Sequence, residues 1–294
     1  MNIEMDLVSD WKSIMSQRIL DKGLQFSSGL REDAKIIKYF TFLRKLGGKT
    51  QGRQVYKSKE FSCPTVHLAG LNQLIETLKN GKDISPYLSK KVENISKIDG
   101  MFNDWGVLHL HLGDRLEKTG RYIERTGPLL FLYLMPESAF LINIYQHKEW
   151  THKSILQTVY DNWPELIESY IIPDSTGVTH ALTESQHLDA REAGSLVLME
   201  LTKSSGEKFA IMPPGLGITS SGDPIQDVRY FDTIINKLRT LEDFFRENLQ
   251  EELVVELLGA MPNPVKLKLI NQSGNNWIFE EVSTQKIIFE IPYE

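Results

Sequence analysis

The chain has little cysteine and no long hydrophobic run. It contains one cysteine, Cys63, among 294 residues, which excludes a disulfide within the chain and a zinc site built from a cysteine cluster. The longest apolar run, PLLFLYLM, is strand-sized and falls well short of the roughly 18 residues that a membrane-spanning helix needs. The N-terminal residues have no apolar core of the signal-peptide type. We therefore expect a cytoplasmic protein without a membrane span.

The chain also lacks an overall positive charge. Its formal net charge of −6 at pH 7 argues against bulk binding of nucleic acid. The charge is unevenly distributed, because residues 31–59 contain nine Lys or Arg and two acids, whereas residues 241–294 contain ten acids and four bases. Such runs are usually solvated surfaces. The alternative is that the basic stretch meets an anion such as RNA phosphate, and that the acidic C-terminal part recognises a protein partner.

The hydrophobic pattern predicts both helices and strands. Helical spacing of apolar residues indicates helices near residues 4–20, 29–49, 67–83 and 151–160, and one long helix or two in tandem over 228–259. Period-two alternation indicates strands in VLHLHL, PLLFLYL and AFLINIY, with MPES as the hairpin turn between the last two. A second hairpin is expected around KSSGE, and three β-segments in the last thirty residues or so.

These elements predict an α+β chain of two parts. Residues 1–173 are expected to hold N-terminal helices and a small antiparallel sheet packed by helices. Residues 174–294 are expected to form a second α+β part with the long amphipathic helix. The boundary is placed near Pro173 because DSTGVTHALTES, which follows it, reads as a connecting stretch.

The stretch DWGVLHLHLG, residues 104–113, carries the pattern that is most informative about function. On a strand, His109 and His111 share one face, opposite the leucines that alternate with them. A third histidine, His147, follows a neighbouring predicted strand. The plain interpretation is a solvated or satisfied set of strand histidines. A metal site is another, since H-x-H can bind zinc, and His147 with Asp104 or Glu149 would complete the ligands.

General acid–base chemistry is the third interpretation, because imidazole takes and gives a proton near neutral pH. Attack by an RNA 2′-hydroxyl needs a base, an acid and cations but no metal, and Arg121 and Arg125 are cations near the histidines. The tryptophans at 105, 150 and 163 could stack on bases, although such residues more often pack at the rim of a core.

The order of these elements resembles the RelE/ParE toxin superfamily. The resemblance rests on LKNGKDISPYLSKKV, then DWGVLHLHLG, then RTGPLLFLYLMPESAFLINIYQHKEW, and it covers about residues 65–152. It matches Gly81 to Leu88 with a turn segment, Arg125 to Tyr133 with an R-x-L-Y strand, and His147 with Lys148 as a closing basic pair. The resemblance implies a toxin or phage-defence effector. RelE-like members cut mRNA on the ribosome, whereas ParE-like members poison gyrase.

The expected function is therefore metal-independent cleavage of RNA, with no cofactor. RNA, the ribosome, or an antitoxin bound through the acidic C-terminal part are the expected partners. Two alternatives stay open, a non-catalytic interaction protein and a metal-dependent hydrolase that uses the H-x-H strand. The candidate catalytic residues are His109, His111, Arg125 and His147. The candidate substrate-binding residues are Arg121, Lys148, Trp150 and Lys153.

Overall fold

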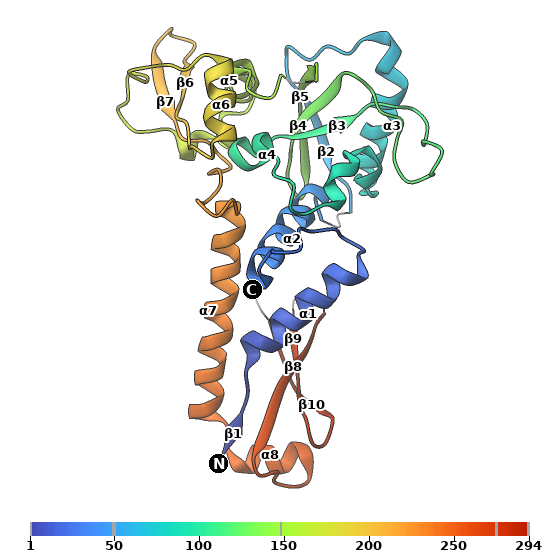
Figure 1. Cartoon of the computed structure of the whole chain (residues 1–294), viewed down its shortest axis with the longest axis vertical. Coiled ribbons are helices and arrows are strands. Elements are labelled where there is room, and N and C mark those ends of the chain that lie inside the picture. The colour runs from blue at the N-terminus through green and yellow to red at the C-terminus, as the bar shows by residue number, and fades with distance from the viewer. Residues whose placement is uncertain (1, 49–50, 148, 274–275, 293–294) are drawn as a thin grey trace. The chain divides into compact units, whose positions relative to one another are not determined.

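The structure is a computed structural model, and it describes residues 2–48, 51–147, 149–273 and 276–292, without the side chains of 272 and 273. By its contacts the chain divides into two compact units. Unit 1 comprises Met1–Tyr39 and Asp227–Glu294, and unit 2 is the continuous segment Phe40–Gln226. Helices and small sheets occur in both units (Figure 1), which confirms the predicted α+β class. No helix in the described part of the chain is long and apolar enough to cross a membrane.

This division differs from the predicted boundary near residue 173. The segment around that residue pairs with a strand of unit 2, because the Ile172 N–H donates to the Ala210 carbonyl at 2.9 Å and the Met212 N–H donates to the Tyr170 carbonyl at 2.9 Å. The stretch that reads as a linker is therefore an irregular connection inside one unit. The last residues of the chain belong with the first, an arrangement that local composition does not reveal.

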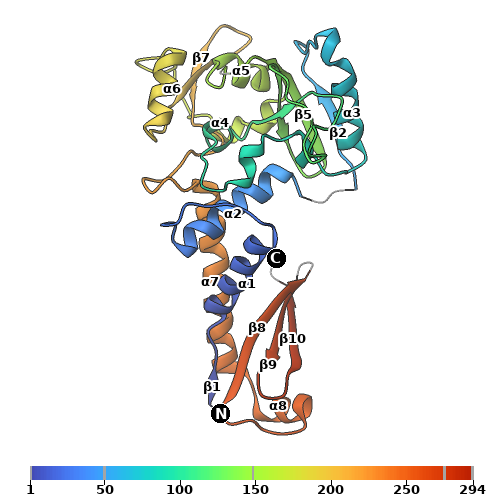
Figure 2. The ribbon, with the colours of Figure 1, turned by 45° about the vertical axis from the view of Figure 1, so that its right-hand side comes forward.

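Unit 1 is built from the two ends of the chain. Its sheet has the order β1-β8-β9-β10, in which β1 (Ile3–Glu4) pairs in parallel with β8 (Val265–Ser273). Strands β9 (Asn276–Glu281) and β10 (Lys286–Pro292) continue the sheet in antiparallel fashion, as Figure 2 shows. These are the three predicted C-terminal β-segments.

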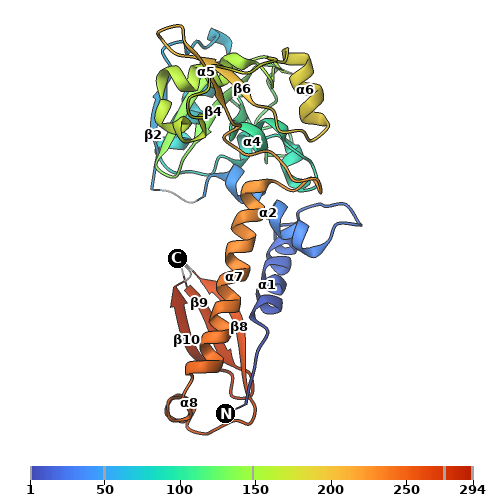
Figure 3. The same cartoon turned by 90° about the vertical axis from the view of Figure 1, so that its left-hand side faces the viewer.

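The helices of unit 1 form because their apolar residues recur at helical spacing. In α1 (Leu7–Asp21) the residues Leu7, Trp11, Met15 and Ile19 are four apart and all buried. The Asp6 side chain accepts from the Ser9 N–H at 2.9 Å and caps this helix. The predicted long helix is two in tandem, α7 (Ile225–Asn248) and α8 (Glu251–Leu258), seen from the side in Figure 3. Helix α2 (Glu32–Leu46) begins in unit 1 and ends in unit 2.

Unit 2 contains a four-stranded sheet of order β2-β5-β4-β3. The predicted strands are present as β3 (Leu108–His111), β4 (Leu129–Leu134) and β5 (Ser138–Tyr145), and the turn between β4 and β5 is the predicted hairpin. Strand β2 (Gln54–Lys57), which pairs in parallel with β5, was not predicted because it is short and has one aliphatic residue, Val55. Strand β3 lies at an edge of the sheet.

Both faces of this sheet are buried. One face, which carries Leu108, Leu110 and Leu112, packs on α3 (Leu68–Lys79). The other, which carries Val107 and Phe131, packs on α4 (Gly100–Trp105), α5 (Lys153–Asn162) and the hairpin of β6 (Met199–Thr202) and β7 (Lys208–Ile211). Because side chains alternate along a strand, His109 and His111 lie on the second face. Helix α6 (Glu184–Glu192), which was not predicted, completes unit 2. Short 3₁₀ helices occur at Thr65–His67, Ser85–Tyr87, Lys90–Glu93, Pro164–Leu166 and Glu168–Tyr170.

Candidate functional site

An aromatic cluster forms around Trp150, beyond the end of β5. The indole of Trp150 is half-buried and stacks nearly parallel on Phe131, with ring centroids 5.5 Å apart and an interplanar angle of 8°. The imidazole of His109 lies 4.8 Å from the indole and that of His147 lies 5.1 Å from it. Tyr145 packs on the same phenyl ring at 4.8 Å. The fold thus brings together two predicted catalytic histidines and one predicted substrate-binding residue. We call the five residues His109, Phe131, Tyr145, His147 and Trp150 the aromatic cluster.

His111 lies two residues further along β3 and is 8% exposed. The Thr126 N–H donates to its Nδ1 at 3.4 Å, so the proton of the neutral imidazole is on Nε2. Burial, together with the positive charge of Arg125, lowers the pKa of His111 to about 4. The imidazole is therefore neutral at pH 7. Arg125 itself is exposed, and its positive charge acts on this histidine.

His109 is also held in its neutral form. Burial lowers its pKa, and the negative charge of Asp99 opposes that shift. Its Nδ1 is buried and has no hydrogen-bond partner among the described residues. Buried polar atoms are nearly always hydrogen-bonded, so an orphan atom in such a position calls for an explanation such as a water or a bound group.

An ion pair that the sequence did not predict lies near His109. Lys45, near the end of α2, contacts the Asp99 carboxylate at 2.8 Å, and both side chains are largely buried. Burial alone would raise the pKa of Asp99, but Lys45 and His109 hold it at about 2. Asp99 also caps α4, since it accepts from the Phe102 N–H at 3.2 Å. This pair fixes the start of α4 beside the histidine strand.

The remaining predicted site residues do not join the cluster. Arg121 is exposed and pairs with Glu93 at 2.8 Å. Lys153, at the start of α5, lies 3.6 Å from Glu200 of strand β6. Lys148 lies outside the described residues. Of the three tryptophans considered for base stacking, Trp105 is 0% exposed and Trp163 is 8% exposed, so both are core residues, whereas Trp150 is partly exposed.

The proposed metal ligands do not assemble. Among the described residues, no three His, Cys, Asp or Glu side chains are arranged to hold a metal ion. Asp104 pairs instead with Arg191 of α6 at 2.5 Å. Glu149 accepts from the Gln146 N–H at 2.6 Å, as part of a turn. The two carboxylates that could have completed an H-x-H site are thus committed to other partners.

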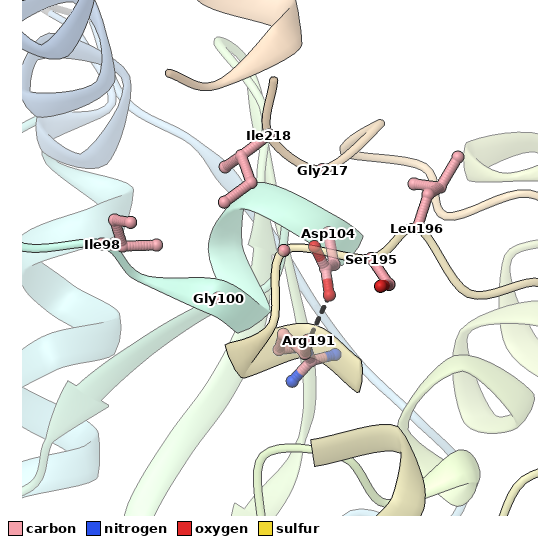
Figure 4. A pocket seen from close by; sticks show the side chains of 9 residues that line it. Ile98, Gly100, Asp104, Arg191, Ser195, Leu196, Gly217 and Ile218 are labelled. Atoms are coloured by element: carbon pink, nitrogen blue, oxygen red, sulfur yellow. Dashed lines mark hydrogen bonds and ion pairs between the residues drawn. The ribbon is translucent and has the colours of Figure 1, made fainter. Parts of the chain in front are cut away.

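The pair of Asp104 and Arg191 is the most deeply buried ion pair of the site region, and sequence reasoning missed it. Burial raises the pKa of the Asp104 carboxyl although Arg191 opposes the shift. The pair borders a hollow of about 10 Å³, shown in Figure 4, which is room for roughly one water molecule. A signal for α6 was present, because Thr183 and Gln186 form a capping box, T-x-x-Q. No local pattern could have paired two residues 87 positions apart.

The residues of the cluster are suited to two tasks, which are stacking on a flat ring and proton transfer. A partly exposed indole with two imidazoles beside it offers a stacking surface for a flat ring. Neutral imidazoles can accept protons, and Arg125 can stabilise a developing negative charge next to His111. Comparisons with protein-family models, with curated proteins and with solved structures found no match to this chain.

Proposed function

We propose that unit 2 binds single-stranded RNA at the aromatic cluster and cleaves it without a metal ion, as a cytoplasmic toxin or phage-defence effector of the RelE type. The observation that carries this proposal is the meeting of the imidazoles of His109 and His147 with the partly exposed indole of Trp150, beside the edge strand that also carries His111. The indole of Trp150 would stack on a base, and Arg125 would contact the phosphate.

The proposed reaction uses His109 as the base and His147 as the acid. His109 takes the proton of the RNA 2′-hydroxyl, and the 2′-oxygen attacks the adjacent phosphorus. The bond between phosphorus and the 5′-oxygen breaks, and the 5′-oxygen receives a proton from His147. The products are a 2′,3′-cyclic phosphate and a 5′-hydroxyl. The Nε2–H of His111 and the guanidinium of Arg125 hydrogen-bond the phosphate oxygens as charge develops on them.

The direct test is cleavage of a labelled single-stranded RNA by the purified full chain in the presence of EDTA. The wild type should produce 2′,3′-cyclic phosphate ends, and an RNA with a 2′-deoxy group at the cut site should stay intact. The variants His109→Gln and His111→Gln should each lose about 10²- to 10⁴-fold in rate. His180→Gln is the matched control, because His180 is exposed in a connecting loop.

The same proposal makes a prediction in cells. Induced expression of the wild type should stop bacterial growth and fragment mRNA, and an equally soluble His109→Ala/His111→Ala variant should do neither. If the purified wild type leaves RNA intact, and its expression changes neither growth nor RNA, the nuclease proposal is wrong.

A second candidate function, binding of a protein partner, is favoured by the surface of α8 in unit 1. Leu253 and Leu257 stand one turn apart and are 38% and 39% exposed. Glu252 and Glu256 are exposed beside them. Two such acidic surfaces would repel each other, so this face fits a basic amphipathic helix rather than a second copy of the chain.

This surface can be tested with an 18-residue amphipathic peptide made of lysine and leucine. The peptide should bind the full chain with an affinity that falls as salt rises. Leu253→Ser/Leu257→Ser should weaken binding about tenfold or more, whereas Leu20→Ser, at an exposed position of α1, should not. Equal binding by these two variants would exclude α8 as the contact.

A further inference from the structure

Helix α6 is attached to unit 2 in an unusual way. A surface helix normally docks through an apolar stripe. In α6 the buried residues are His187 and Arg191, both ionisable. The helix starts at a capping box between Thr183 and Gln186, so its first turn is stabilised locally. Its attachment therefore depends on polar contacts, which water can replace when they open.

At the start of the helix the Thr151 hydroxyl donates to the Glu184 carbonyl at 3.0 Å, and near its end Arg191 makes the remaining contacts. Its Nε donates to Asp104 at 2.5 Å and its Nη1 donates to the backbone carbonyl of Trp150 at 2.7 Å. Its guanidinium carbon lies 4.5 Å from the centre of the Trp105 ring. The Nη2 is buried without a hydrogen-bond partner among the described residues. One side chain thus ties α6 both to α4 and to the loop that carries the stacking indole.

Irregular segments flank α6 on both sides. Residues 173–183 and 193–198 contain no helix or strand, and Gly177 and Gly194 have φ angles of 112° and 75°. Leu196 is 46% exposed, and with Ser195 and Gly217 it borders the small hollow over Asp104 in Figure 4. Few apolar contacts and irregular flanks are the features of a segment that opens at low free energy.

We propose that Arg191 is a positioning residue, and that α6 is a hinged lid which Arg191 closes so that Trp150 is held against His109. Its part in RNA cleavage rests on the proposed function, whereas the positioning of Trp150 does not. In the closed lid the indole shields the imidazole of His109 from water. In the open lid the loop of Trp150 loses its bond to Arg191, and a strand of RNA can reach the aromatic cluster.

The charges around α6 agree with a lid that opens in acid. Burial, together with the positive charge of Arg191, lowers the pKa of His187 to about 4. The ring of His187 packs on the edge of Trp105 at 5.4 Å, and the other charges near Arg191 are Asp104 and Asp99. At the start of the helix the effect is opposite, because a protonated His152 forms an ion pair with Glu184 at 3.1 Å. Protonation of His187 places two cations side by side on the buried face.

The test compares Arg191→Met with the wild type in the full chain. Hydrogen exchange of amides 184–192 should speed up by about tenfold or more, while amides of β4 keep their protection. The proton-detected titration of His109 should move toward the ordinary pKa of a histidine, because its imidazole becomes solvated. Arg191→Lys should restore the pair with Asp104 but not the bond to Trp150, since lysine lacks the guanidinium fork. Arg115→Met is the control, because Arg115 is 79% exposed.

A second variant guards against misfolding. In Asp104→Asn/Arg191→Met no charge is left buried, and the same changes in exchange and in the His109 titration are expected. Unchanged exchange of 184–192 together with an unchanged His109 titration, in either folded variant, overturns the proposal. If these readouts change but the wild type does not cleave RNA, the positioning stands and the nuclease proposal fails. If the wild type cleaves RNA and Arg191→Met cleaves it equally well with both readouts unchanged, the nuclease stands and the lid fails.

Discussion

The two units bury very different side chains. Unit 1 has a mostly apolar interior, in which Lys38, Asp227 and Glu281 are the buried polar side chains among its described residues. All seven histidines of the chain belong to unit 2. Among the described residues of unit 2, the buried polar ones are Arg53, Ser58, Asn103, Asp104, His111, Thr151, His187, Arg191, Glu200 and Asp223. Both units are thus α+β, but unit 2 buries more polar and charged side chains that need hydrogen-bond or ion-pair partners.

The buried glutamate of unit 1 shows what the difference means. Glu281 is 0% exposed, and it accepts from the Ser283 hydroxyl at 2.7 Å and from the Thr284 N–H at 2.9 Å. It serves a tight turn and is satisfied locally. In unit 2 the buried Arg191 pairs instead with Asp104, 87 positions away in the sequence, and its Nη2 has no hydrogen-bond partner among the described residues. The buried charges of unit 2 therefore depend on long-range contacts.

The largest expected effect comes from breaking the buried pair of unit 2. Asp104→Ala leaves the guanidinium of Arg191 buried without its carboxylate, which should lower the free energy of unfolding of unit 2 by about 3–5 kcal/mol. Urea titration followed by hydrogen exchange at β4 and at β9 measures the two units separately. The protection of β9 should not change. A loss below about 1 kcal/mol at β4 would show that water reaches the pair.

The next effect is a response to pH that only unit 2 should show. The pKa values of His111 and His187 are about 4 in the folded chain, below the value of roughly 6.5 in an unfolded one. Between these two pH values the unfolded chain binds more protons than the folded chain. The contribution of the two neutral histidines to the stability of unit 2 is therefore fully present above pH 6.5 and is lost as the pH falls toward 4. The loss is at most about 3 kcal/mol for each histidine.

Urea unfolding at a series of pH values checks this response. His111→Gln and His187→Gln should each flatten the decline in the stability of unit 2, and His180→Gln should not, because His180 is exposed. An equal decline in unit 1 between pH 6.5 and 5 would contradict the contrast between the units, since unit 1 contains no histidine.

A smaller effect belongs to unit 1. Asp6→Ala removes the cap of α1, where the carboxylate accepts from the Ser9 N–H, and should lower the stability of unit 1 by about 1 kcal/mol. Asp6→Asn keeps an accepting oxygen and should restore most of the loss. Thermal unfolding of the three proteins gives the comparison, and a full loss in Asp6→Asn would mean that charge rather than the cap bond matters.

The smallest effect is expected at the surface of unit 2. Arg121→Ala removes an exposed ion pair with Glu93 and should change stability by less than about 1 kcal/mol. Because Arg121 lies outside the aromatic cluster, RNA cleavage should also persist. A large loss of cleavage with normal folding would bring Arg121 back into the binding surface, as the sequence analysis expected.

The sequence predicted those features of the structure that depend on residues close together in the chain. Period-two alternation identified β3, β4 and β5, and strand geometry placed His109 and His111 on one face. The contact of Trp150 with His109 depends on a loop after β5, whose path no periodicity encodes. The pair of Asp104 and Arg191 joins α4 to α6 across 87 positions, so spacing could not reveal it. Likewise, β1 has two residues and is a strand because β8 stands beside it.

The parallel pairing of β1 with β8 has a consequence for synthesis. Residues 3–4 cannot pair until the ribosome has made residues 265–266, far later in the sequence. Unit 2 lies between them as one continuous segment and can acquire its contacts while translation continues, since domains generally fold as units during synthesis. Unit 1 must remain incomplete until residues 265–266 have been made. A ribosome stalled after residue 260 should therefore display a protease-resistant unit 2 preceded by an accessible α1.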